Sequence, residues 1–255
     1  MIGAIIGDIA GSCYEFNNTS DYDFPMFSED KSFTDDTICT VAVADAVMNH
    51  RDFQTSMREW CRKYPHPMGE YGSCFFNWVM RPDPHPYKSY GNGSAMRVSP
   101  VAWLCADEDE VRLLAERSAA ITHNHPEGIK GAVSIAVAIY RMRTAARKTS
   151  GIFEAVAREF YGDDAFSALP DRGRFDVTCQ GCVPLALYLA SRSASFEDAV
   201  RLAVSYGGDT DTVGAIVGSL AEARHGVPPE MVERAKSYLP EDILEVVNQF
   251  EARRL

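Results

Sequence analysis

The chain has 255 residues, of which 46% are hydrophobic and 24% are charged, so it can bury a sizeable core as an ordinary globular protein. Its formal net charge of −11 argues against an extended nucleic-acid surface, because non-specific binding to a phosphate backbone requires clustered Lys and Arg. A small phosphorylated ligand stays possible, since backbone amides and metal ions hold phosphate without net basic charge.

The first ten residues are apolar, and three glycines recur over residues 1–11 at intervals of four: Gly3, Gly7 and Gly11. This spacing permits close packing of one helix against another. The dinucleotide fingerprint G-x-G-x-x-G is absent. The segment carries Asp8 and no basic leader, so we expect no secretory signal.

Residues 17–31 form a polar, aromatic and acidic stretch without periodicity. The stretch directly precedes Asp35 and Asp36, so we expect it to act as a lid over whatever these carboxylates hold.

Apolar residues then recur with helical spacing from Asp36 to Asn49. Further helices are predicted at residues 53–64, 110–121, 131–147, 152–160, 183–190, 196–205, 213–224, 230–238 and 243–253. Segments 133–140 and 213–218 resemble buried strands, but the apolar run around each is about 12 residues long, which favours helix. No linker or repeat divides the chain. We therefore predict one all-α domain over residues 1–255.

A glycine turn at residues 90–94, with the sequence Tyr-Gly-Asn-Gly-Ser, precedes a helical stretch through Met96. Its backbone amides can face outward and cradle a phosphate. A purely structural turn is the alternative.

Two histidines follow in the sequence His123-Asn124-His125. Zinc ligation would need more His or Cys ligands at recognisable spacing, and these are missing. A hydrogen bond from one histidine to a substrate or to a helix end is the favoured interpretation, with a packed histidine as the alternative.

Seven cysteines are scattered along the chain, an odd number that suits a reducing cytoplasm better than a disulfide framework. Cys179 and Cys182 have C-x-x-C spacing, but no second pair accompanies them. Thiols lining a helix are favoured over redox or zinc chemistry. No apolar run of about 18 residues is present, so we expect no spanning helix.

Two acidic clusters, at residues 34–37 and 208–212, each open a helix. Helix capping needs one Thr or Asp and at most one carboxylate in the first turn, which is fewer than these clusters provide. If the two helix starts meet, their oxygens form a cup that repels itself unless a divalent cation neutralises it. The clusters therefore predict a site for two Mg²⁺ or Mn²⁺ ions.

Five segments together resemble the ADP-ribosylglycohydrolase family, in the family's order and over nearly the whole chain. They are residues 7–11 with Glu15, the cluster at 34–37, the turn at 91–97, Thr122-His123, and the cluster at 207–212. The resemblance implies a compact, orthogonal all-α helical bundle with a binuclear metal site. It also implies cleavage of ADP-ribose from a modified acceptor, with a protein as the expected acceptor.

The resemblance also implies roles for individual residues. Metal ligands would be Thr34, Asp35, Asp36, Asp209, Asp211 and Thr212. Catalytic carboxylates would be Glu15 and Asp36. Residues binding ADP-ribose would be Tyr90, Gly91, Asn92, Gly93, Ser94, Met96 and His123.

Two other functions fit parts of the sequence. A metal-dependent nucleotide phosphohydrolase would also use clustered aspartates on a helical scaffold. A non-catalytic ADP-ribose-binding or immunity protein would not need the full set of oxygen ligands that this chain carries. The acceptor stays open among arginine, serine, a nucleic-acid base, a terminal phosphate and O-acetyl-ADP-ribose.

Overall fold

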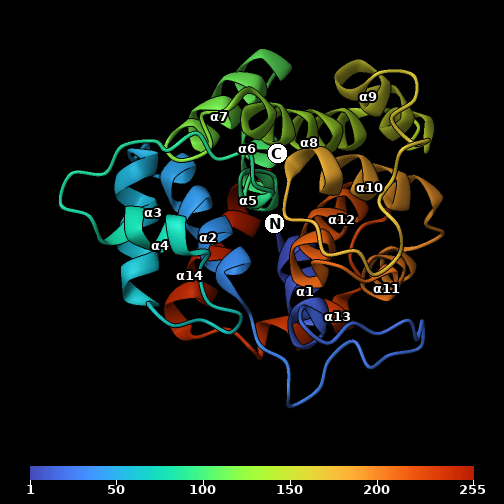
Figure 1. The fold of residues 1–255 in the computed structure, drawn as a ribbon, viewed down its shortest axis with the longest axis horizontal. Helices are drawn as coiled ribbons and strands as arrows, with labels where there is room; N and C mark the ends of the chain where they lie inside the picture. The colour runs from blue at the N-terminus through green and yellow to red at the C-terminus, as the bar shows by residue number, and fades with distance from the viewer.

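The computed structural model describes residues 1–255 and consists of helices and loops without a β-sheet (Figure 1). The helices are α1 Ile2–Gly11, η1 Ser12–Tyr14, α2 Asp35–Met48, α3 Phe53–Lys63, α4 Ser73–Met80, α5 Gly93–Met96, α6 Ser99–Leu104, α7 Glu108–Ala120, α8 Pro126–Thr144, α9 Gly151–Tyr161, α10 Cys179–Arg192, α11 Phe196–Tyr206, α12 Thr210–His225, α13 Pro229–Lys236 and α14 Glu241–Arg253. The prediction of an all-α fold is confirmed. None of these helices is long and apolar enough to cross a membrane.

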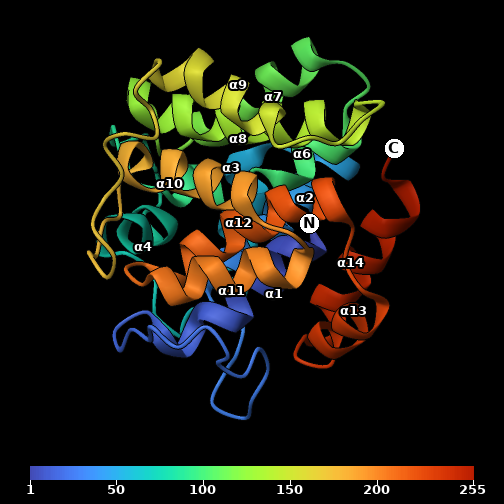
Figure 2. The same ribbon diagram turned by 90° about the vertical axis from the view of Figure 1, so that its right-hand side faces the viewer.

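Helices α1 and α12 lie against each other at the centre of the molecule, although they come from opposite ends of the chain (Figures 1 and 2). Their backbones touch through glycines. A Cβ atom built on Gly7 would lie only 1.9 Å from the carbonyl oxygen of Gly214, and one on Gly3 would lie 2.4 Å from that of Gly218. The glycine repeat thus brings the two helices together, as its spacing predicts.

The remaining helices surround this central pair. Helices α7, α8 and α9 form a layer at the top of Figure 1, and α2, α3 and α4 lie to one side. Helices α10 and α11 pack against α12, while α13 packs against α1 and α14 against α2. All helices predicted from periodicity are present within a few residues of their expected ends. The short helices α4 and α6 were not predicted, because they span too few turns to show periodicity.

Residues 17–31 do not form the predicted lid. This loop lies at the edge of the molecule opposite α7–α9 (Figures 1 and 2), and none of its residues lines the cavity that contains Asp35 and Asp36. Phe24 is buried, and the buried Nζ of Lys31 donates to the carbonyl oxygen of Ala10 at 2.6 Å. The polar composition suggested a mobile cover, but these two side chains fasten the loop to the core.

Candidate metal centre and ligand pocket

The two acidic helix starts meet in space. Thr34 caps α2 by accepting a hydrogen bond from the backbone N–H of Asp36 at 3.2 Å. Asp209 precedes the first turn of α12. The hydroxyl of Thr212 donates to Oδ2 of Asp36 at 3.2 Å, which joins residues 176 positions apart. The cup of oxygen atoms expected from the sequence is therefore formed.

Glu15 completes the cup from the loop after α1. One ligand atom each of Glu15, Asp209 and Asp211 lies within 4.8 Å of the others. Asn18 holds the backbone just before Asp209. Its side chain accepts a hydrogen bond from the N–H of Gly208 at 2.7 Å and donates one to the carbonyl oxygen of Gly208 at 2.9 Å. Gly208 has a φ of +90°, which favours glycine. Asn18 is a supporting residue that the sequence did not reveal.

The residues present fit a divalent cation. Burial, followed by the repulsion of Asp211, raises the pKa of Asp36 and of Asp209 well above the usual aspartate value. Oδ1 of Asp36 is buried without a hydrogen-bond partner. Clustered carboxylate and hydroxyl oxygens are the hard ligands that Mg²⁺ and Mn²⁺ prefer. A cation would supply both the missing partner and the missing charge.

Asp8 organises the cup from inside α1. It is fully buried, and its Oδ2 accepts from the backbone N–H groups of Thr34 at 3.0 Å and Thr37 at 3.1 Å, as well as from the Thr37 hydroxyl. Burial, followed by the repulsion of Asp211, raises its pKa to about 7. The only sequence signal for this role was an aspartate inside an otherwise apolar helix.

A cavity of about 490 Å³ joins the acidic cup to the glycine turn. Its lining includes Glu15, Asp35, Asp36, Gly91, Asn92, Gly93, Met96, His123, Asp209, Asp211 and Thr212. Nδ2 of Asn92 donates to Oδ2 of Asp209 at 2.6 Å, so the turn and the cup are directly connected. Most of the residues predicted for metal and ligand therefore share one cavity.

Three predicted site residues do not line this cavity. Thr34 is fully buried and caps α2. Ser94 is also fully buried, and its hydroxyl donates to the carbonyl oxygen of Gly128 at 2.7 Å. Tyr90 is 48% exposed and packs edge-on against His125, with 5.3 Å between ring centroids. In this structure Thr34 and Ser94 support the site from behind.

The mouth of the cavity carries aromatic residues that the sequence did not single out. Phe16 and Phe175 stack with 6.0 Å between ring centroids, and they are 75% and 48% exposed. Gly69, with a φ of +79°, brings the backbone against Glu15, where a Cβ atom would lie 2.8 Å from Oε2. The segment beside Glu15 is therefore the loop before α4.

The two C-x-x-C thiols support the glycine turn. Sγ of Cys179 lies 3.0 Å from the carbonyl oxygen of Gly91, and Sγ of Cys182 lies 3.3 Å from Nδ2 of Asn92. Both cysteines are buried at the start of α10, and all seven cysteines are free. This agrees with the prediction of thiols lining a helix.

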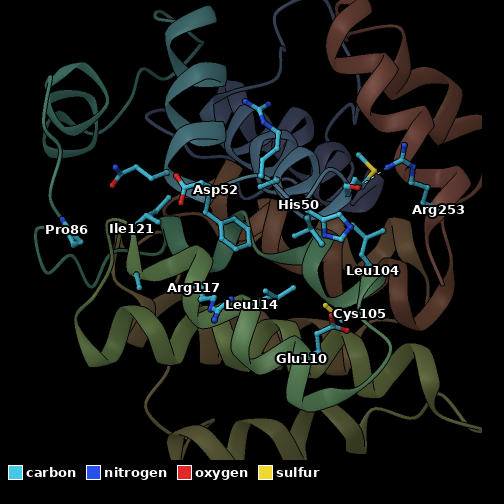
Figure 3. Close-up of a pocket in the computed structure, with 17 residues that line it drawn as sticks. His50, Asp52, Pro86, Leu104, Cys105, Glu110, Leu114, Arg117, Ile121 and Arg253 are labelled. Atoms are coloured by element: carbon cyan, nitrogen blue, oxygen red, sulfur yellow. Dashed lines mark hydrogen bonds between the residues drawn. The ribbon is translucent and has the colours of Figure 1, made fainter.

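A larger hollow of about 830 Å³ lies elsewhere, between the end of α2 and helices α7 and α14 (Figure 3). The two carboxylates that line this hollow already accept hydrogen bonds from backbone N–H groups. Asp52 caps α3 by accepting from the N–H of Thr55 at 2.8 Å, and Glu110 accepts from that of Ala106 at 3.1 Å. Arg253 donates to the carbonyl oxygen of Met48 at 3.1 Å. Size alone therefore does not identify the functional site; the convergence of several carboxylates in one cavity does.

The metal-free protein should lose stability as the pH rises. Burial, followed by the repulsion of Asp211, raises the pKa of Glu15 from 4.5 to about 8. Between these values the folded protein holds protons that the unfolded chain releases, so the free energy of unfolding falls with rising pH. Urea unfolding at pH 5 and pH 8 in a chelator should show this fall, and saturating Mg²⁺ should reduce or reverse it. Equal or greater metal-free stability at pH 8 would contradict the prediction.

Known proteins are similar to this sequence over its whole length. The sequence profile described as ADP-ribosylglycohydrolase matches residues 1–254. The chain belongs to the ADP-ribosylglycohydrolase family. It is 25% identical to ADP-ribosylhydrolase ARH3 of Xenopus tropicalis, over 100% of this chain and 95% of the relative. It is 26% identical to ADP-ribosylarginine hydrolase Tri1 of Pseudomonas putida (strain GB-1), over 92% and 72% respectively.

The fold also matches a solved structure. A chain of an ADP-ribosylglycohydrolase-related protein complex superposes with a TM-score of 0.73 at 23% identity, and the match covers 99% of this chain and 95% of the other. The helical architecture is therefore shared over its full length.

Proposed function

We propose that this protein is a divalent-metal-dependent hydrolase that cleaves the glycosidic bond between ADP-ribose and a modified acceptor, releasing ADP-ribose. The observation that carries the proposal is the single cavity in which Asn92 links the glycine turn to Asp209. Such a cavity can hold a diphosphate at one end and place a ribose beside the carboxylates at the other. Membership of the family supports the same reaction.

We assign two Mg²⁺ or Mn²⁺ ions as cofactors. One side of the cup would contribute Asp35 and Asp36, with Thr34 capping the helix start behind them, and the other Asp209, Asp211 and Thr212. When bound, such ions orient ribose hydroxyls and activate a water molecule beside the anomeric carbon. The seven free cysteines support action in a reducing compartment such as the cytoplasm.

Two carboxylates of the cup each carry out one of the two proton transfers. Asp36 accepts a proton from the attacking water. Glu15 donates a proton to the leaving-group oxygen as the bond to the anomeric carbon breaks. Glu15 is half-buried beside Gly69, and its carboxyl lines the cavity. The acceptor would leave past Phe16 and Phe175, which form the exposed mouth.

A panel of ADP-ribosylated acceptors tests this function. The protein with Mg²⁺ should release intact ADP-ribose from at least one of an arginine-linked peptide, a serine-linked peptide, modified nucleic acid and O-acetyl-ADP-ribose, as read by mass spectrometry. Release of AMP or phosphate instead would indicate a phosphohydrolase. Binding of ADP-ribose without any product from the panel would indicate a binding protein.

Replacing Glu15 with Gln should separate catalysis from binding. The substitution leaves the other carboxylates and the glycine turn in place, so ADP-ribose affinity should stay within a few-fold of wild type. Turnover should fall about 10²–10⁴-fold, the usual contribution of a positioned acid or base. Serine-linked substrates should suffer most, because an alkoxide leaving group needs a proton more than a guanidine does.

The matched control is Glu233→Gln, which removes an exposed carboxylate on α13 that lies outside the cavity, 3.8 Å from Nζ of Lys236. It should retain turnover close to wild type. Full activity of Glu15→Gln on every acceptor would remove Glu15 from the mechanism and leave Asp36 as the candidate for proton transfer.

A further inference from the structure

Three residues behind the glycine turn form a directed chain of hydrogen bonds. Nη2 of Arg97 donates to Oγ1 of Thr122 at 2.9 Å, and that oxygen lies 2.7 Å from Nδ1 of His123. Arg97 is 1% exposed, Thr122 is fully buried, and His123 is 5% exposed. Water therefore has little access to rearrange these contacts.

The guanidinium of Arg97 fixes the direction of the chain. Arginine has only donors, so its contact with Thr122 occupies a lone pair of the hydroxyl oxygen. The hydroxyl proton then has one remaining partner, Nδ1 of His123, because Oγ1 makes no other hydrogen bond. The opposite arrangement, with Nδ1–H donating, would bury that hydroxyl proton without an acceptor, at a cost of about 1–3 kcal/mol. Nδ1 is thus the acceptor.

The histidine is also kept neutral. Burial, followed by the positive charge of Arg97, lowers the pKa of His123 well below its usual value. A neutral imidazole that accepts at Nδ1 carries its proton on Nε2. Arg97 itself has no carboxylate partner, and its nearest aromatic contact is Phe75, at 6.0 Å from the ring centroid. No carboxylate therefore offsets the effect of the Arg97 charge on His123.

Nε2 of His123 faces the glycine turn. A Cβ atom on Gly93 would lie 3.3 Å from Nε2, a tight contact, and one on Gly91 would lie 3.5 Å from it, so the absence of a side chain at Gly93 in particular leaves this nitrogen open to the cavity. Nε2 makes no hydrogen bond within the protein, whereas the neighbouring His125 caps α8 through Nδ1, which accepts from the N–H of Glu127 at 3.1 Å. Of the two histidines, His125 serves the helix end and His123 is free for a ligand.

We propose that Arg97 and Thr122 are positioning residues that hold His123 in its neutral Nε2–H tautomer, so that it donates a hydrogen bond to an oxygen of the ligand held at the glycine turn. The identity of that ligand as ADP-ribose rests on the function proposed above. The tautomer does not depend on it, because Arg97 and Thr122 fix it in the absence of ligand.

The test is nitrogen-15 NMR of histidine-labelled protein. Wild type without ligand should show His123 with a protonated Nε2 and an unprotonated Nδ1. In Thr122→Val, which keeps the shape but removes the hydroxyl, the Nδ1–H tautomer should appear and ADP-ribose affinity should fall about tenfold, the value of one lost hydrogen bond. Thr122→Ser should restore both. KM should change more than kcat.

The matched control is Thr40→Val, which removes a buried hydroxyl that has no hydrogen-bond partner and lies outside the cavity. It should change neither the tautomer nor the affinity. A wild-type His123 protonated on Nδ1 or on both nitrogens would overturn the proposal even if Thr122→Val fails to fold. Unchanged tautomer and affinity in a folded Thr122→Val would overturn it as well. An Nε2–H tautomer without ADP-ribose binding would support the positioning role while refuting the proposed function.

Discussion

Replacing Asp211 with Asn should reduce turnover by about 10⁵-fold, to background, while leaving the metal-free protein at least as stable as wild type. Asp211 is 3% exposed, and its charge contributes to the raised pKa of Asp8, Glu15, Asp36 and Asp209. Removing that charge relieves the repulsion among the carboxylates when no cation is bound, but it also removes a cation ligand. Without the cation, the ribose and the attacking water lose the orientation that contributes factors of about 10⁵ in well-placed systems.

Thermal unfolding with chelator and with Mg²⁺, beside activity assays, measures both parts of this prediction. Wild type should gain stability from Mg²⁺ by mass action, and Asp211→Asn should gain none. Asp45→Asn is the matched control. Asp45 is also a buried carboxylate, but Arg51 and Trp60 already satisfy it. That variant should be destabilised yet keep its response to Mg²⁺. A Mg²⁺ response in Asp211→Asn equal to that of wild type would refute the assigned ligand set.

Replacing Gly7 with Ala should destabilise the protein by about 3 kcal/mol or more. The added methyl group would lie 1.9 Å from the carbonyl oxygen of Gly214, so backbone must move against backbone. Such overpacking costs about 1–3 kcal/mol even where side chains can adjust, and here none is available to give way. The higher helix propensity of alanine, worth about 1 kcal/mol, is too small to compensate.

Urea unfolding measures this loss, and Gly151→Ala supplies the control. Gly151 is exposed at the first position of α9, and the nearest atom to an added Cβ is Oγ1 of Thr149 at 3.7 Å. Alanine there should be neutral or should stabilise by about 0.4–1 kcal/mol. If Gly7→Ala were as stable as wild type, α1 and α12 would have to separate more easily than their packing indicates.

Local patterns were enough to predict much of the fold. The amphipathic and fully apolar helices follow from periodicity, and the glycine spacing predicts that α1 packs closely on another helix, although not that this helix is α12. The short helix α4 carries no such pattern, because eight residues make barely two turns. The prediction of a lid at residues 17–31 was wrong because a polar composition does not show which side chains bind the loop to the core. In the structure Phe24 and Lys31 do so.

In the site, too, some residues could be predicted from the sequence and others could not. Asp35, Asp36, Asp209 and Asp211 stand out in the sequence because a helix start does not need so many carboxylates. The contact between Asn92 and Asp209 could not be predicted, since it joins residues 117 positions apart and depends on how α5 and α12 pack. Asn18 gave no sequence signal, and Asp8 and Thr122 lay in recognised segments without a role, because each of the three acts by holding another residue in place.

The contact of Thr212 with Asp36 spans 176 positions of a chain without disulfides. A cation held between these two helix starts would act as a reversible cross-link that closes a loop of most of the protein. A cross-link that closes a loop of this length stabilises the folded state by about 5 kcal/mol, because it lowers the conformational entropy of the unfolded chain. The supply of divalent ions would then govern how long the protein survives proteolysis, so its abundance as well as its activity would follow the metal content of its surroundings.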